Sequence, residues 1–185
     1  TPPFHQLSAA AFALGHNFLA LDDDGVARRI APFVRNGDRY LPSLGMAAAL
    51  AAAGARPDEV ALEGETIRVR GRRIPLVAIS VYDPNSRASL QQWTMLINYR
   101  APDHVAGKRP YPTYEARHLL VSQDLLLAGQ KPLVDPAVFK DKIVFIGLTG
   151  AGLVDVFQTP MGGGLMPGIQ LHATVADSVL SNRFI

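Results

Sequence analysis

Residues 143–160 read IVFIGLTGAGLVDVFQTP, and this stretch carries the strongest indication of the fold. Four apolar residues lead into three closely spaced glycines, Gly147, Gly150 and Gly152. A buried β-strand that enters a glycine-rich loop is typical of phosphate-binding α/β proteins. Three roles are compatible with such a loop: a nucleotide cradle, a backbone turn that needs small residues, and a loop that holds another small ligand or packs a partner segment.

The glycine loop fits neither phosphate-binding template. A P-loop requires a lysine directly after its second glycine, but here Leu153 follows Gly152. The dinucleotide fingerprint G-x-G-x-x-G opens a helix directly after the strand, and GLTGAG has a different spacing. Asp155 is followed by valine, phenylalanine and a proline, which is a poor helix start. The sequence therefore favours a turn, or a site for another ligand, over a nucleotide cradle.

The composition is that of a globular domain. Of the 185 residues, 48% are hydrophobic and 18% are charged, which is enough apolar content for a core. The net charge of +2 is too small and scattered to indicate nucleic acid. One basic run, RVRGRR at 68–73, fits either a solvated strand edge or a site for an anionic partner. The chain contains no cysteine, which excludes disulfides, thiolate metal sites and a cysteine nucleophile.

Turn and capping signals predict the elements of the first half. The dipeptides Asp24-Gly25 and Asn36-Gly37 supply the positive φ angles of tight turns between antiparallel strands. Serines before apolar runs predict helix starts, and glycines after them predict helix ends. We expect strands at 16–21, 26–34 and 38–41, a helix at 9–14 capped by Ser8, and an apolar, buried helix at 44–53 opened by Ser43 and ended by Gly54.

The second half alternates strands and helices. We expect a strand pair at 66–71 and 73–78 around Gly71, a strand at 92–99, a helix at 123–128 capped by Ser122 and ended by Gly129, strands at 142–147 and 168–173, and a last helix ending near Asn182. Together these elements predict an α/β or α+β fold, with a mixed β-sheet, an antiparallel hairpin region and flanking helices.

Candidate catalytic and metal-binding patterns are weak. The acidic turn at 22–25 resembles the start of a calcium loop, but the first and twelfth ligand positions fall on alanines, so ion pairs to Arg28 or Arg29 are favoured. No histidines have metal-ligand spacing. His172 is expected either to form a structural hydrogen bond to the neighbouring loop or to contact a ligand. No G-x-S-x-G elbow or locally paired nucleophile is present. The residues predict neither an enzyme nor a metal or cofactor site.

Four stretches, in this order, resemble the second type of cyclase/histidine-kinase-associated sensory extracellular domain, of the CHASE group. They are FLALDDDGVARRIAPFVRNGDRYLPSLGMAAALAAAG, INYRAP, KDKIVFIGLTGAGLVDVFQTPM and PGIQLHATVADSVLSNRFI. The positions that match the family's motifs are Asp22, Asp24, Gly25, Val26, Arg28, Pro32, Pro42, Ser43, Leu44, Ile97, Asn98, Tyr99, Pro102, Lys142, Val144, Ile146, Gly147, Asp155, Thr159, Pro160, Pro167, Gly168, His172 and Ala173.

The resemblance implies that residues 1–185 are one extracytoplasmic sensor domain, the C-terminal portion of a larger CHASE-type domain. Such domains begin with a further segment, absent here, that carries an acidic strand and a helix. The strand neighbours of IVFIG are then expected to lie in that segment. The domain itself is non-catalytic, and the output lies in a separate cyclase or kinase domain.

The implied function is recognition of a signal outside the cytoplasmic membrane of a bacterium. The signal, a small molecule or a protein, would pass through adjacent transmembrane helices to an adenylate or diguanylate cyclase, a histidine kinase or a serine/threonine kinase. The full receptor is expected to be a homodimer, without a nucleic-acid partner. The alternative is a structural dimerisation module that binds no small molecule. Because α/β proteins bind ligands where strand ends meet loops, the predicted ligand-binding residues are Gly147, Thr149, Gly150, Gly152, Asp155, Thr159 and His172.

Overall fold

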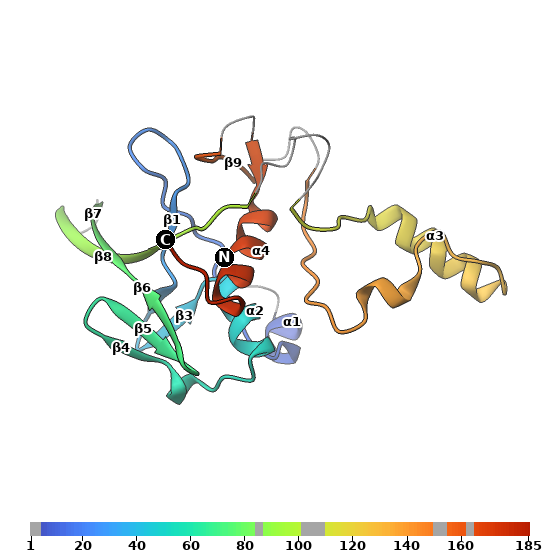
Figure 1. Cartoon of the computed structure of the whole chain (residues 1–185), viewed down its shortest axis with the longest axis horizontal. Coiled ribbons are helices and arrows are strands. Elements are labelled where there is room, and N and C mark those ends of the chain that lie inside the picture. Colours follow the sequence, from blue (N-terminus) through green and yellow to red (C-terminus); the bar gives the residue numbers. More distant parts are fainter. Residues whose placement is uncertain (1–4, 84–86, 101–109, 150–154, 162–164) are drawn as a thin grey trace.

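A computed structural model of the chain describes residues 5–83, 87–100, 110–149, 155–161 and 165–185 (Figure 1). The helices within these residues are α1 (His5–Ala10), α2 (Leu44–Ala52), α3 (Ala116–Leu127) and α4 (Gly168–Leu180), with the short 3-10 helices η1 (Pro57–Glu59) and η3 (Pro136–Phe139). The strands are β1 (Arg29–Ile30), β2 (Phe33–Asn36), β3 (Arg39–Pro42), β4 (Ala61–Glu63), β5 (Thr66–Val69), β6 (Arg72–Pro75), β7 (Val77–Asp83), β8 (Ala88–Leu96), β9 (Val156–Gln158) and β10 (Leu165–Pro167).

These strands form several small, open sheets. Two three-stranded sheets have the orders β1-β8-β7 and β4-β5-β6, and β2–β3 and β9–β10 form two-stranded sheets. Every strand pair is antiparallel in the described part of the chain, where parallel contacts occur as the isolated bridges His16–Ser43 and Val26–Gln158. The predicted class, α/β or α+β with an antiparallel hairpin region and flanking helices, is confirmed. The predicted mixed β-sheet is not found among the described residues, whose strands pair only antiparallel.

The turn signals predicted the positions of the hairpin turns better than the sequence predicted the boundaries of the strands. Gly37, between β2 and β3, has φ 62°, as its Asn-Gly dipeptide predicted. Gly71, at the predicted turn of the strand pair β5–β6, has φ 77°. The strand predicted at 16–21 is wrong, since only a single bridge at His16 forms there. The strand predicted at 26–34 is divided between β1 and β2. Alternating side chains indicated which residues are extended, but not whether a pairing partner lies alongside.

Helix α2 forms the centre of the core, as its apolar sequence predicted. Ser43 is buried and accepts a hydrogen bond on its side chain from the N–H of Met46 at 3.4 Å, which confirms it as the helix cap. Gly54 follows the helix with φ 63°. Helix α2 packs along α4 (Figure 1). Met46 of α2 and Leu171 of α4 are fully buried. Each such side chain contributes about 1.5–3 kcal/mol through burial.

Two predicted helix starts are wrong because the serines lie inside helices. Ser8 Oγ donates to the carbonyl of His5 at 3.0 Å, and α1 ends at Ala10. Ser122 Oγ donates to the carbonyl of His118 at 2.6 Å, in the middle of α3. A serine hydroxyl satisfies a preceding carbonyl inside a helix as readily as it caps a helix start, so the residue type alone does not separate the two.

The strand predicted at 168–173 is also wrong. These residues form the first turns of α4, which ends at Leu180. Leu171, Val175 and Val179, each at most 2% exposed, recur at helical spacing and face the core. Six residues at the start of this pattern alternate well enough to suggest a strand, but the pattern over the whole segment is helical.

Residues 142–149 form neither helix nor strand, although 142–147 was predicted as a buried strand. In Figure 1 this orange segment runs beside α4 without a neighbouring strand. A strand needs a hydrogen-bonded neighbour, and the described residues do not supply one. The predicted burial is wrong as well: Phe145 packs against the core, but the other large apolar side chains of the run are exposed.

Helix α3 and η3 form an arm that projects away from the sheets (Figure 1). The rings of Tyr114 and Phe139 pack edge to face with centroids 5.2 Å apart, and the N–H of Val134 donates to Ser122 Oγ at 2.9 Å. A largely apolar cleft of about 360 Å³ lies between α3 and residues 134–139. The base of the arm is joined to α4, because Tyr111 Oη donates to Asp177 Oδ2 at 3.3 Å.

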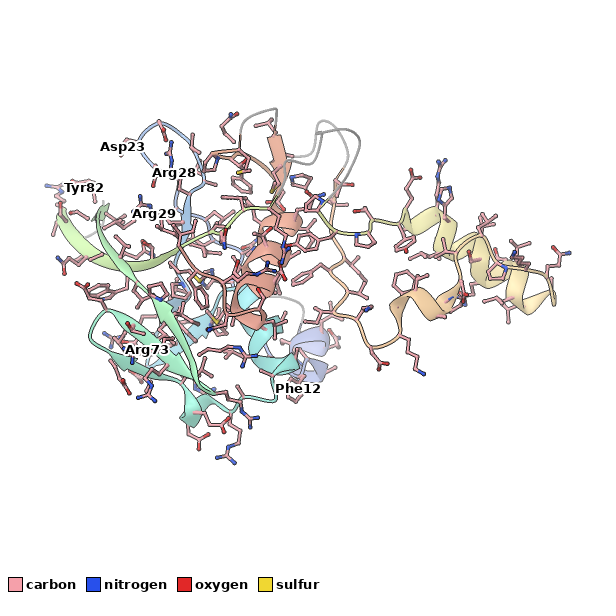
Figure 2. The ribbon with its side chains drawn as sticks, in the orientation of Figure 1. Phe12, Asp23, Arg28, Arg29, Arg73 and Tyr82 are labelled. Carbon is pink, nitrogen blue, oxygen red and sulfur yellow. The ribbon has the colours of Figure 1, made fainter. Side chains whose placement is uncertain are left out.

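The basic run at 68–73 is mostly paired within the chain. Arg68 forms an ion pair with Glu63 on the neighbouring strand, and Arg70 pairs with Glu59. Arg72 donates to the carbonyl of Leu180 at 3.3 Å. Arg73, labelled in Figure 2, is exposed on β6. These contacts favour the solvated-strand interpretation over a site for an anionic partner.

Candidate functional site

The start of α4 is built around the contact between Asp155 and Gly168. Pro167 stands at the cap position and provides no side-chain hydrogen bond. Instead, the N–H of Gly168 donates to the carbonyl of Asp155 at 3.0 Å. A Cβ at position 168 would lie 2.5 Å from Asp155 Oδ1, so only glycine leaves room for this carboxylate. The negative charge beside the helix start is stabilised by the helix dipole.

His172 lies one turn further along α4 and is only 3% exposed. Its Nδ1 is buried without a hydrogen-bond partner among the described residues. Burial, together with a smaller contribution from the nearby His16, lowers the pKa of His172 to about 4, and Asp155 opposes the shift. The imidazole is therefore neutral at pH 7. The structural hydrogen bond to the neighbouring loop that was expected for His172 is not formed by Nδ1 within the described residues, and a buried polar atom without a partner requires an explanation.

A second histidine, His16, lies near His172 and is half-buried. Its backbone is fixed by two hydrogen bonds, from its own N–H to the carbonyl of Pro42 at 2.9 Å and from the N–H of Leu44 to its carbonyl at 2.8 Å. Neither ring nitrogen has a described partner in good hydrogen-bond geometry. Burial lowers the pKa of His16, and the backbone of Ala31 opposes the shift. Two neutral imidazoles are thus held close together beside α4.

Close packing of α2 on α4 contributes to the burial of His172. A Cβ at Gly45 of α2 would collide with the carbonyl oxygen of His172 and would lie 2.8 Å from Cβ of Val175. Glycine at this position lets the two helix backbones approach closely. Any movement of α4 along α2 therefore changes the surroundings of His172 directly.

The structure brings some of the predicted site residues together. Asp155 and His172 lie at the start of α4, and Gly147 packs against Ile169 there, where a Cβ would lie 2.7 Å from Cβ of Ile169. Thr159 is 4% exposed just after β9. Thr149 is exposed. The predictions for Gly150 and Gly152 lie outside the described residues.

Sequence reasoning missed His16 and Gln170. Both have buried side-chain atoms without a described hydrogen-bond partner, namely both ring nitrogens of His16 and Oε1 of Gln170. His16 and His172 are at opposite ends of the sequence, so no local spacing connects them. Gln170 lies within an apolar run, and a polar side chain in such a run is the sequence signal that could have identified it.

The acidic turn at 22–25 is a structural feature. Arg28 pairs with Asp22 at 3.0 Å and with Asp24 at 2.7 Å, and Arg29 pairs with Asp22 at 2.9 Å. Arg28 and Arg29 are labelled in Figure 2. The guanidinium of Arg28 lowers the pKa of Asp24 to about 2. The predicted ion pairs are confirmed, and they satisfy the carboxylates that a calcium ion would otherwise need.

The arrangement at α4 suits recognition of a small polar group. It combines a carboxylate, two neutral imidazoles and a helix start, which together offer hydrogen-bond donors and acceptors.

No group of three or more potential metal ligands is gathered within the described residues. In the same part of the chain, no helix has the length and apolarity needed to cross a bilayer.

Comparison with known proteins gives one match. The family model described as CHASE2 domain matches residues 3–185, nearly the whole chain. No curated protein and no solved structure matches the sequence significantly.

Proposed function

The chain belongs to the CHASE2 domain family, and we propose that it is the extracytoplasmic sensory domain of a bacterial membrane-bound receptor. CHASE2 domains are sensory domains of receptors, and the sensing portion is not itself catalytic. In this proposal the domain recognises its signal outside the cytoplasm. Adjacent transmembrane helices then pass the change to an adenylate or diguanylate cyclase, a histidine kinase or a serine/threonine kinase.

One observation carries the proposal of a ligand site at the start of α4. His172 is buried with an unpaired Nδ1 within electrostatic range of Asp155, and the helix that bears it packs along α2. A ligand that bonds to these groups would favour the packing of α4 that presents them. The free energy available for signalling is the difference between its affinities for the two packings.

The site groups suggest a small molecule with both hydrogen-bond donors and acceptors. The Asp155 carboxylate accepts hydrogen bonds, and a neutral imidazole offers one donor and one acceptor. Gly168 lets the Asp155 carboxylate approach the start of α4 closely, and Gly147 does the same for the side chain of Ile169. A ligand in this position would replace the hydrogen bonds that the buried histidine lacks.

The alternative function is a structural module that dimerises the receptor and binds no small molecule. An exposed apolar run at 143–148 favours this alternative, because such surfaces are usually covered by protein. The two functions differ in whether a small molecule changes the stability of the domain.

Thermal-shift screening of a library of small polar metabolites tests the proposal. A ligand at about 100 times its dissociation constant adds roughly 2.7 kcal/mol to the stability of the folded state. The Asp155→Asn variant keeps the size of the side chain and should lose this shift. The matched control is Asp23→Asn, which changes an exposed acid on the 22–25 turn and should retain it. A screen without any stabilising compound, or a shift that Asp155→Asn leaves intact, would contradict the proposed site.

A further inference from the structure

The arm formed by α3 and η3 is joined to the body of the protein by two chain segments, one before α3 and one after η3 (Figure 1). Both segments contact α4. In the first, Tyr111 Oη donates to Asp177 Oδ2 at 3.3 Å. In the second, Gly147 packs so closely on Ile169 that a Cβ at position 147 would lie 2.7 Å from Cβ of Ile169. The arm is therefore in contact with the same helix through both of its connections.

The two contacts lie at different levels of α4. Ile169 is in the first turn of the helix and Asp177 is in the third. A separation of eight residues corresponds to about 12 Å along the helix axis. Because the contacts are this far apart along the helix, a tilt of the arm cannot leave both of them unchanged. A change in the position of the arm is thus felt by α4.

The carboxylate of Asp177 is shared between the arm and the sheets. Arg100 Nε donates to Oδ2 of Asp177, the same oxygen that accepts the hydrogen bond from Tyr111. Arg100 directly follows Tyr99, whose hydroxyl donates to the carbonyl of Ala27 at 2.6 Å. Arg100 is thereby fixed to the chain around β1 and β8. Asp177 is held to the sheets by one partner and to the arm by the other.

The two bonds to Asp177 differ in strength. Arg100 and Asp177 form an ion pair, and hydrogen bonds between charged groups are the stronger kind. The bond from Tyr111, at 3.3 Å, is longer than the usual O–H···O distance of about 2.7–2.8 Å. The bond from Tyr111 is therefore the one that breaks when the arm moves. Since Arg100 stays in place, the break leaves no unpaired carboxylate and costs little.

We propose that Asp177 couples the position of the α3 arm to the packing of α4. While the Tyr111 bond is formed, a displacement of the arm acts on the third turn of α4. Once the bond is broken, that part of α4 is held by Arg100 alone. Such coupling is reciprocal, so a change that begins at α4 alters the arm by the same free energy. It arises from contacts within the chain and holds whether or not the α4 site binds a ligand.

Amide hydrogen exchange of the whole chain, read by mass spectrometry, tests this coupling after a perturbation inside the arm. Phe139→Leu removes the ring that packs on Tyr114 and should loosen the arm. In the parent chain this change should speed exchange in α3 and also in the last two turns of α4. In the Tyr111→Phe background it should speed exchange in α3 without a further increase in α4. A hydrogen bond of ordinary net strength corresponds to roughly two- to tenfold in such rates.

The matched control is Tyr114→Phe, which removes a hydroxyl from the same segment and keeps the ring that packs on Phe139. In this background Phe139→Leu should act on α4 as it does in the parent chain. Rates in α4 are compared with those of β5, because a loss of stability of the whole domain would speed exchange in both.

Asp177→Ala cuts the same link from the side of α4 with a residue that favours helix, and it serves if Tyr111→Phe does not fold. It should abolish the effect of Phe139→Leu on α4 as Tyr111→Phe does. Exchange in α4 that Phe139→Leu leaves at the parent rate would overturn the proposal. An increase in α4 that is equal with and without the Tyr111 hydroxyl would also overturn it.

Discussion

Acidification should destabilise this domain through His172. The pKa of His172 falls from 6.5 to about 4 in the folded protein because the side chain is buried. Between these two values the unfolded chain binds a proton at this residue and the folded chain does not. The free energy of unfolding therefore falls as the pH falls through this window, and the full loss is reached below the folded-state pKa.

The size of the effect follows from the shift. Each pKa unit corresponds to about 1.4 kcal/mol, so His172 should remove about 3 kcal/mol of stability between about pH 6.5 and pH 4. The side chain is only 3% exposed, so solvent screens the effect little. The lowered pKa of His16 adds a loss of the same sign. Domains of this size are typically stable by about 5–15 kcal/mol, so the loss should be easily measured.

Urea unfolding followed by circular dichroism, at pH steps from about 7 to about 4, measures this loss. His172→Gln keeps a neutral polar side chain, so its pH profile should be flatter than that of the wild type by about 3 kcal/mol over the window. His5→Gln changes an exposed histidine on α1 and should follow the wild type. The comparison concerns slopes, since His172→Gln also changes the stability at neutral pH. Parallel profiles for the wild type and His172→Gln would refute the reasoning.

Three further predictions concern the frame around the site. Gly45→Ala should separate α2 from α4 and cost roughly 1–3 kcal/mol in thermal unfolding, whereas Ala52→Ser, at an exposed position of the same helix, should change stability by less than about 0.5 kcal/mol. Ser43→Ala should remove the α2 cap and cost about 1 kcal/mol by urea unfolding, and an unchanged midpoint would contradict the assigned cap. Arg28→Gln should raise the pKa of Asp24 from about 2 towards the ordinary value in an NMR titration, and no movement would show that the pair is absent in solution.

The sequence predicted local turns and caps well because their signals are local. Gly37 and Gly71 were placed correctly because their positive φ angles disfavour other residues. The cap at Ser43 was predicted correctly because the capping serine, the apolar helical run and a terminal glycine follow one another in the sequence. Ser122 was misplaced because a serine inside a helix bonds a preceding carbonyl and leaves the same sequence pattern.

The site was only partly predictable, because its key contacts are long-range. Asp155 and His172 were selected from the motifs near the glycine loop, and the structure places both at the start of α4. His16 was not selected, since nothing local connects it to residues at the other end of the sequence. The strand expected at 142–147 depended on a neighbour, and side-chain alternation alone carries no information about which segment supplies it.

Native mass spectrometry of the purified chain, set against its denatured mass, tests the sensory role most directly. The account predicts an excess native mass from a retained small molecule, which the Asp155→Asn variant loses. Dimerisation would double the polypeptide mass and is readily distinguished from such an excess. A native mass equal to the polypeptide or to a whole multiple of it, in both the wild type and the variant, would contradict a retained ligand at α4 and favour the structural module.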